Sequence, residues 1–111
     1  MEDIGDEIAI KTLRKIFLKK PQTTLGVDHI IFLNTYQGIA SVCYEAKKEM
    51  CHSGGIVQGG FITGWIDAVM ALACMAKCGT DVLVLTLEIK ISFLNSAKIG
   101  KVISTGKVIK N

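Results

Sequence analysis

Residues 61–78 read FITGWIDAVMALACMAKC and are followed by Gly79, and this stretch decides the fold. Its apolar side chains lie on every side of a helix rather than along one stripe, which is typical of a helix buried on most of its surface. A glycine directly after such a run is the usual residue at a helix C-terminus. The sequence therefore predicts one long central helix, about 27 Å from end to end.

Segments with the pattern of strands lie on both sides of this helix in the sequence. Residues 82–94 alternate strictly between apolar and polar side chains, as in a strand with one buried and one wet face. The other predicted strands are residues 27–35, 39–47 and 101–110. Together these segments predict an α+β fold in which a sheet curls around the long helix.

A shorter helix is predicted near the N-terminus. Residues 4–19 are amphipathic, with acidic side chains first and basic side chains last, as the helix dipole favours, and Pro21 ends the pattern. A chain of 111 residues has room for one core, so residues 1–111 are expected to form a single domain. A helix that is apolar on every side exposes more apolar surface than a few strands can bury. The remaining faces therefore predict that a second subunit packs against it.

Composition narrows the class of protein. Half of the residues are hydrophobic and 21% are charged, which excludes a disordered chain and a protein that is mostly membrane-embedded. A net charge of +3 is too small to predict a nucleic-acid partner. The longest apolar run is interrupted by Asp67 and is too short to predict membrane insertion. The acidic N-terminus lacks the pattern of a secretory signal, so a cytoplasmic protein is expected.

The cysteines and histidines do not form a metal-binding pattern. Four cysteines and two histidines are present without a pair of CxxC motifs, so no metal and no cofactor are expected. Cys74 and Cys78 are one helical turn apart, with Cβ atoms about 5–6 Å apart, whereas a disulfide needs about 4 Å. Both are expected to be reduced core residues without a catalytic role.

Asp67 and the glycines before it are the candidate functional residues. A buried carboxylate needs partners, so Asp67 is either satisfied by nearby N–H or hydroxyl groups or acts as a general base or nucleophile in an apolar site. Residues 54–60 read GGIVQGG and lead into the helix start, where unsatisfied N–H groups carry partial positive charge. Glycines there form either a tight turn or an oxyanion site that a substrate carbonyl can approach.

The spacing of these residues resembles the hotdog-fold thioesterases of the phenylacetate-degradation type. That family has a His-Gly-Gly motif and an aspartate seven residues after the second glycine, and here Gly59, Gly60 and Asp67 have this spacing. Residues 93–100, FLNSAKIG, resemble the family's strand and its proline-alanine-x-x-glycine turn, with Ser96 at the proline place. The resemblance covers roughly residues 30–110.

The resemblance implies a fold, a reaction and an assembly. The fold is an antiparallel sheet wrapped around one long helix, and the reaction is metal-free hydrolysis of acyl-CoA thioesters. The assembly is a homodimer or a dimer of dimers, with active sites built from both chains at the interface. Gly59 would donate its backbone N–H to the thioester oxygen, Asp67 would be the general base or nucleophile, and Thr86 would position water or the carboxylate.

The sequence departs from the family at two motif positions. His52 stands where the family has an asparagine, and it is either a residue that orients water or an ordinary loop histidine. Gln58 stands at the place of the family histidine, where it can form hydrogen bonds but cannot exchange protons near neutral pH. Further substrate-binding residues are expected at Gly60, by its place in the motif, and at three lysines that match the phosphates of CoA in charge. These lysines are Lys90, Lys98 and Lys101, and the alternative is that they are ordinary solubilising residues on the surface.

Two further points stay open at the level of sequence. The family continues through one or two more strands, so either the final strand or strands are missing from this chain or a partner completes the sheet. The alternative functions are a non-catalytic acyl-CoA- or lipid-binding hotdog protein and a hotdog dehydratase acting on acyl-carrier-protein thioesters. Dehydratases of this fold use a histidine and a carboxylate, and the spacing of His52 does not match that pattern.

Overall fold

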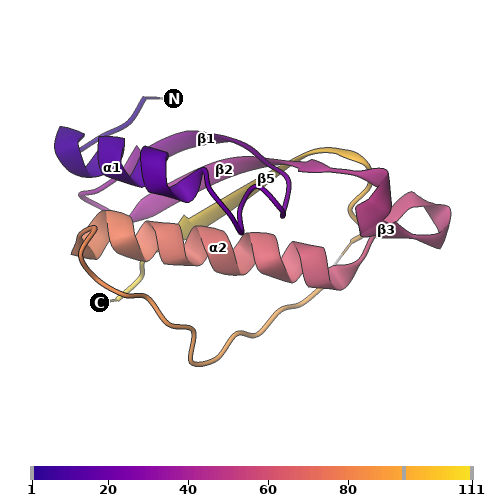
Figure 1. The fold of residues 1–111 in the computed structure, drawn as a ribbon. Coiled ribbons are helices and arrows are strands. Elements are labelled where there is room, and N and C mark those ends of the chain that lie inside the picture. The colour runs from indigo at the N-terminus through magenta and orange to yellow at the C-terminus, as the bar shows by residue number, and fades with distance from the viewer. Residues whose placement is uncertain (1, 94, 111) are drawn as a thin grey trace.

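The computed structural model describes residues 2–93 and 95–110 as a sheet packed on one long helix (Figure 1). The two helices are α1 (Glu7–Phe17) and α2 (Gly59–Cys78). The strands are β1 (Val27–Asn34), β2 (Ile39–Ala46), β3 (Cys51–His52), β4 (Ile56–Val57) and β5 (Gly100–Lys107). Short 3-10 turns precede and follow β3, at Lys48–Met50 and Ser53–Gly55. The predicted α+β class with a central helix is confirmed.

The main sheet is antiparallel with the strand order β1-β2-β5. β2 is the middle strand: its Val42 pairs with Ile30 of β1 and with Ser104 of β5. Alternate residues of β2 are fully buried against α2, namely Ala40, Val42, Tyr44 and Ala46. Three of the predicted strands are thus confirmed with slightly shorter bounds. β3 and β4 form a small separate hairpin within the segment that precedes α2.

α2 lies along the inner face of the sheet, and its contacts explain the position (Figure 1). Trp65 is buried and stacks on Tyr44 with ring centroids 5.6 Å apart, while its indole N–H donates to the carbonyl of Leu25 at 2.7 Å. Gly106 of β5 lets the helix approach closely, because a Cβ there would lie 3.0 Å from the carbonyl oxygen of Val69. By length and hydropathy α2 could cross a membrane, a test that the central helix of a globular domain also passes, and here α2 packs its buried residues against the sheet.

α1 covers one side of the core and is fixed at both ends. The Asp6 carboxylate caps its N-terminus by accepting from the N–H groups of Ile8 and Ala9. Arg14 forms a two-bond ion pair with Asp3, at 2.8 Å for each bond, and donates to the carbonyl of Ile30 on β1. The hydrogen bond from Arg14 holds the pKa of the Asp3 carboxyl below its usual value. The predicted first helix is confirmed, with shorter bounds than residues 4–19.

The prediction of a strand at residues 82–94 is wrong for residues 82–93, the part of this segment that the structure describes. Residues 82–93 are extended coil that passes beneath α2, and Leu94 lies outside the described residues (Figure 1). A strand requires a neighbour for its backbone hydrogen bonds, and within the described part of the chain this segment has none. The alternation in sequence is nonetheless genuine, because it leaves a row of exposed apolar side chains, among them Leu85 and Leu87.

The cysteines are free, but they are less buried than expected. Cys43 is buried, Cys51 and Cys74 are half-buried, and Cys78 is exposed. The prediction that Cys74 and Cys78 are core residues is therefore wrong, because the sheet covers only one side of α2. The opposite side of the helix, including Met70, remains accessible.

Candidate functional site

The side chains of Asp67 and Thr86 meet on the side of α2 that faces away from the sheet. Asp67 lies in the third turn of α2 and is half-buried. Thr86 belongs to the coil that passes beneath the helix, and its hydroxyl donates to Asp67 Oδ1 at 2.6 Å. This short, charge-assisted hydrogen bond fixes the rotation of the carboxylate. Two residues that are 19 positions apart thus form one polar unit.

A groove of about 590 Å³ opens beside this pair. Its walls are mainly apolar and come from α2, at Met70 and Ala71, and from the coil, at Val84 and Leu85. Asp67 and Thr86 contribute polar groups to this lining. In this carboxylate, one oxygen accepts a hydrogen bond from a hydroxyl at the edge of an apolar groove. Such a group can accept a proton from water or attack an electrophilic carbon.

Gly59 forms a second site feature at the N-terminus of α2. It is the first helical residue, preceded by Gln58 at the N-cap position with φ −63° and ψ 138° and no side-chain cap. The N–H groups of a first helical turn have no acceptor within the helix, so they can bind a substrate oxygen. Gly59 lines a cavity of about 360 Å³ together with Phe93 and Asn95, two residues that the sequence did not identify.

Gly59 and Asp67 do not meet within one chain. They are eight positions apart in α2, which corresponds to about 12 Å along the helix axis. They line different cavities, and among the residues that the structure describes the two cavities have none in common. A thioester carbon must be about 3 Å from both an attacking atom and an oxyanion donor. A single chain therefore supplies the two halves of a site in separate places.

Comparison with known proteins identifies the family of the chain. Residues 54–110 match the model of the thioesterase superfamily. The chain belongs to the thioesterase superfamily. A proposed esterase of Saccharolobus solfataricus is 32% identical over 105 residues, which are 94% of this chain and 73% of that protein. The matched region contains the glycine pair, Asp67 and Thr86.

Solved structures of the superfamily share the fold. A thioesterase family protein from Silicibacter pomeroyi is 25% identical with a TM-score of 0.79, over 90% of this chain and 72% of that chain. A phenylacetic acid degradation-related protein from Ralstonia eutropha has the same TM-score of 0.79 at 23% identity, over 93% of this chain and 79% of that chain. The expected hotdog architecture of a thioesterase is thus confirmed, and the family supports hydrolysis of thioesters in general.

The other predicted motif residues lie on the hairpin that leads into α2. His52 is exposed at the end of β3, and its side chain is not in contact with Asp67 within the described residues. Gln58 is also exposed, and its backbone N–H donates to the carbonyl of Met50 at 2.9 Å. Gly60 is exposed beside Gly59, and a Cβ at Gly60 would meet nothing within 4 Å. The surroundings of this helix end are therefore open to a ligand.

The three lysines that were predicted to bind the phosphates of CoA do not form one cluster. Lys90 is exposed, with its Nζ 3.9 Å from a Glu88 oxygen. Lys98 is exposed next to the wall of the Gly59 cavity, where its backbone forms an isolated bridge with Ile56. Lys101 lies on the outer face of the sheet and is bound to two carboxylates there. Lys101 therefore lies on the opposite side of the sheet from α2, where its ammonium group already has two carboxylate partners.

Proposed function

We propose that this protein hydrolyses acyl-CoA thioesters, with Asp67 as general base or nucleophile. The observation that carries the proposal is the 2.6 Å hydrogen bond from Thr86 to Asp67 beside an apolar groove, in a member of the thioesterase superfamily. The hydrogen bond holds the carboxylate in one orientation, and the apolar walls suit an acyl chain. No metal takes part in this mechanism.

The proposed reaction begins with the thioester carbonyl oxygen accepting a hydrogen bond from the Gly59 N–H. Asp67 removes a proton from a water molecule, whose oxygen attacks the carbonyl carbon. The negative charge that forms on the carbonyl oxygen is stabilised by the Gly59 N–H and the partial positive charge of the helix N-terminus. The tetrahedral intermediate then loses its C–S bond, and the leaving thiolate of CoA takes the proton that Asp67 removed from water, which restores the carboxylate. If Asp67 attacks directly, an acyl-aspartate anhydride forms first and water cleaves it.

The reaction centre in this proposal is built by two chains. Gly59 and Asp67 are about 12 Å apart along α2, which is too far for one substrate carbon. A second copy can place its own Asp67 and Thr86 opposite the Gly59 of the first. We propose a homodimer, alone or as half of a dimer of dimers, with two equivalent sites at the interface.

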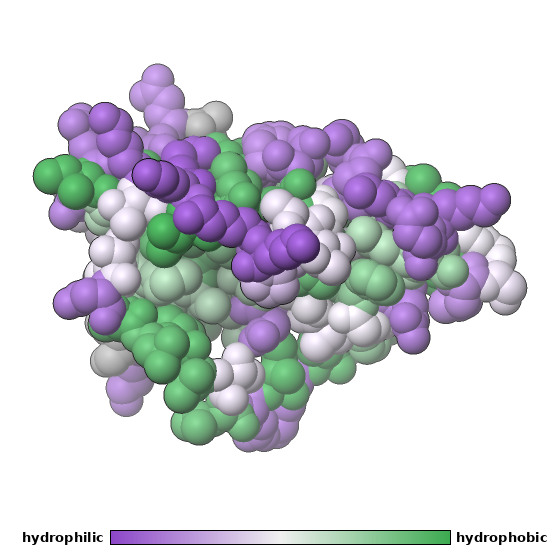
Figure 2. All heavy atoms as spheres, in the orientation of Figure 1, coloured by the Kyte–Doolittle hydropathy of each residue, from purple (hydrophilic) through white to green (hydrophobic). Residues whose placement is uncertain are grey.

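Exposed apolar side chains support this assembly. Leu83, Leu85 and Leu87 of the coil beneath α2 are 84%, 73% and 100% exposed. Figure 2 shows hydrophobic side chains gathered over the lower part of the molecule, where this coil runs in Figure 1. A continuous exposed apolar surface is typical of a protein–protein interface. In the dimer this segment would gain the strand neighbour that it lacks in the single chain.

The remaining motif residues have supporting roles in the proposal. Gln58 and Gly60 flank the oxyanion donor, and His52 orients water at the mouth of the site. Lys90 and Lys98 pair with the phosphates of CoA. The reaction takes place in the cytoplasm, where thiols stay reduced, in keeping with the four free cysteines.

The proposal is tested by an acyl-CoA hydrolysis assay on the wild type and on Asp67→Asn. Removing the base should lower kcat by roughly 10²–10⁴-fold with KM little changed. The matched control is Asp81→Asn, because Asp81 is an exposed aspartate that does not line the groove. Equal turnover by a folded Asp67→Asn protein would overturn the mechanism.

The same substrates separate the alternative functions. Binding of acyl-CoA without turnover by the wild type would favour the non-catalytic lipid-binding protein. Loss of water from a 3-hydroxyacyl thioester on a carrier protein would favour the dehydratase. A panel of short aliphatic, long aliphatic and aromatic acyl groups, each on CoA and on a carrier protein, distinguishes these outcomes.

A further inference from the structure

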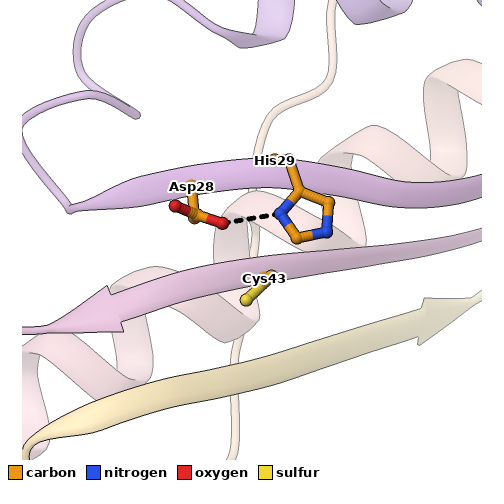
Figure 3. Close-up of side chains that lie close together, drawn as sticks. All are labelled: Asp28, His29 and Cys43. Atoms are coloured by element: carbon orange, nitrogen blue, oxygen red, sulfur yellow. Dashed lines mark hydrogen bonds and ion pairs between the residues drawn. The ribbon is translucent and has the colours of Figure 1, made fainter.

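Three side chains with metal-binding atoms meet on the outer face of the sheet, on the opposite side from α2. These are Asp28 and His29 of β1 and Cys43 of β2 (Figure 3). The carboxylate oxygen, imidazole nitrogen and thiol sulfur all lie within 4.8 Å of one another. His29 Nδ1 is 2.6 Å from Asp28 Oδ2, and His29 is the direct cross-strand partner of Cys43.

A β-bulge brings these three side chains to one face. Val27 pairs with Tyr44 and His29 pairs with Cys43, so β1 contributes one residue more than β2 over this interval. The extra residue is Asp28. Neighbouring residues of a regular strand point to opposite faces, whereas a bulge redirects one of them. Asp28 and His29 therefore both face Cys43, although they are adjacent in sequence.

We propose that Asp28, His29 and Cys43 bind one divalent transition-metal ion of the zinc class. A thiolate, an imidazole and a carboxylate are the three kinds of side chain that bind zinc, and sulfur with nitrogen favours zinc over magnesium or calcium. Metal–ligand bonds of about 2.0–2.3 Å in a tetrahedral site place the ligand atoms roughly 3.3–3.7 Å apart. The side chains of His29 and Asp28 are 58% and 39% exposed, so both have space to rotate inward. Water completes the fourth position.

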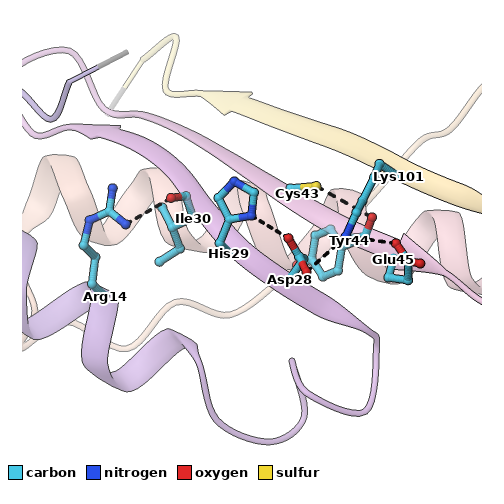
Figure 4. Close-up of polar contacts among 8 residues, drawn as sticks. All are labelled: Arg14, Asp28, His29, Ile30, Cys43, Tyr44, Glu45 and Lys101. Carbon is cyan, nitrogen blue, oxygen red and sulfur yellow. Dashed lines mark hydrogen bonds and ion pairs between the residues drawn. The ribbon is translucent and has the colours of Figure 1, made fainter.

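The charges around the site suit a dication. Lys101 Nζ lies 3.1 Å from Asp28 Oδ1 and 3.1 Å from Glu45 Oε2 (Figure 4). Lys101 therefore holds one oxygen of Asp28 and leaves the other, Oδ2, directed at His29. With the thiolate of Cys43, the two carboxylates carry three negative charges, which Lys101 and a divalent ion balance. Such a partner fixes the orientation of the ligand carboxylate.

A nucleophilic Cys–His–Asp arrangement is less consistent with the same geometry. Cys43 is only 6% exposed, and its Sγ is 3.9 Å from the Tyr44 carbonyl oxygen. Burial, and then the charge of Asp28, raise the pKa of the Cys43 thiol. A catalytic thiol needs access and a lowered pKa. A metal ion imposes the thiolate form by coordination, so metal binding does not require a thiol pKa that is already low.

The spacing of cysteines and histidines in the sequence gave no sign of this site. The ligands come from two strands, and only strand pairing brings Cys43 to Asp28 and His29. An ion here would join β1 to β2 at the bulge, where the pairing is irregular. The site is separated by the sheet from Asp67, so it is independent of the proposed hydrolysis.

The test uses Co²⁺ and Zn²⁺ with metal-free protein reduced by a phosphine. Co²⁺ bound to a thiolate gives a characteristic charge-transfer absorption, which Zn²⁺ should abolish by competition. We expect one ion per chain and a raised thermal midpoint with Zn²⁺. His29→Ala and Cys43→Ser should each weaken binding at least tenfold, and Cys43→Ser should remove the charge-transfer band.

Matched controls are present in the same chain. His52→Ala removes the other histidine, and Cys78→Ser removes an exposed cysteine, so neither should change metal affinity. His29 is exposed, so His29→Ala should fold normally and remain informative even if Cys43→Ser does not fold. Absence of Co²⁺ binding by the folded wild type would overturn the proposal. Binding that survives His29→Ala but is lost in His52→Ala or Cys78→Ser would overturn it as well.

Discussion

Replacing Thr86 with valine tests whether the contact with Asp67 supports catalysis. Valine keeps the shape of threonine but cannot donate to Asp67 Oδ1, where the native bond is 2.6 Å. A hydrogen bond to a charged group contributes about 1.5–3 kcal/mol. Thr86 is exposed, so water replaces part of the lost bond, and the lower end of that range applies. We therefore expect a loss of about 1.5 kcal/mol, which corresponds to a roughly tenfold lower kcat.

Steady-state hydrolysis of acyl-CoA, followed by release of the free thiol, measures this effect. KM should change little, because the hydroxyl contacts the carboxylate rather than the substrate. Thr86→Ser is the matched control, since it keeps the donor and should retain most of the activity. A Thr86→Val enzyme with unchanged kcat would refute the role given to this hydrogen bond.

Three further predictions concern stability and assembly. Gly106→Ala should lower the free energy of unfolding by about 1–3 kcal/mol in urea titrations, because its Cβ would lie 3.0 Å from α2 atoms, whereas Gly60→Ala, in open space, should not. Asp3→Asn should lower the free energy of unfolding by about 0.5–1 kcal/mol at pH 7, and this loss should shrink as the pH falls through the lowered pKa of Asp3. The reason is that Arg14 lowers the pKa of Asp3, so the ion pair stabilises the fold at neutral pH and is lost as the pH falls through that value. Leu85→Asp should shift sedimentation toward monomer, and an unchanged mass would argue against this face as the interface.

Local patterns in the sequence predicted most of the fold. The run of apolar residues in α2 has helical length, and its single glycine, Gly64, did not break it, so its prediction was correct to within two residues at the N-terminus. The alternation at residues 82–94 predicted a strand that does not form in the single chain. A strand depends on hydrogen bonds to a neighbour, and local alternation carries no information about where that neighbour lies.

The two sites differ in how far the sequence revealed them. Asp67 was identifiable because a carboxylate in an apolar helix needs a polar partner or a function. The resemblance to the thioesterase family then implied that Thr86 positions this carboxylate or a water molecule. The cluster of Asp28, His29 and Cys43 depends on a bulge and on pairing between strands. The only local signal was a pair of adjacent polar residues, Asp28 and His29, within an otherwise apolar strand segment.

A mixing experiment with two inactive variants tests most directly whether two chains build the active site. Gly59→Pro removes the oxyanion N–H at the first helical position, where proline is tolerated, and Gln58 already has backbone angles suited to precede it. Asp67→Asn removes the base. Hybrid dimers would contain one site with both Gly59 and Asp67 intact and one site with neither.

If the two variants mix at random in equal amounts, half of the dimers are hybrids. In each hybrid, one of the two active sites is restored. We therefore expect about a quarter of wild-type activity after unfolding and refolding the variants together, while each variant treated alone stays inactive. Both variants should keep the far-UV circular dichroism and the sedimentation of the wild type. A refolded mixture that contains hybrid dimers but remains as inactive as its components would contradict an active site shared between subunits.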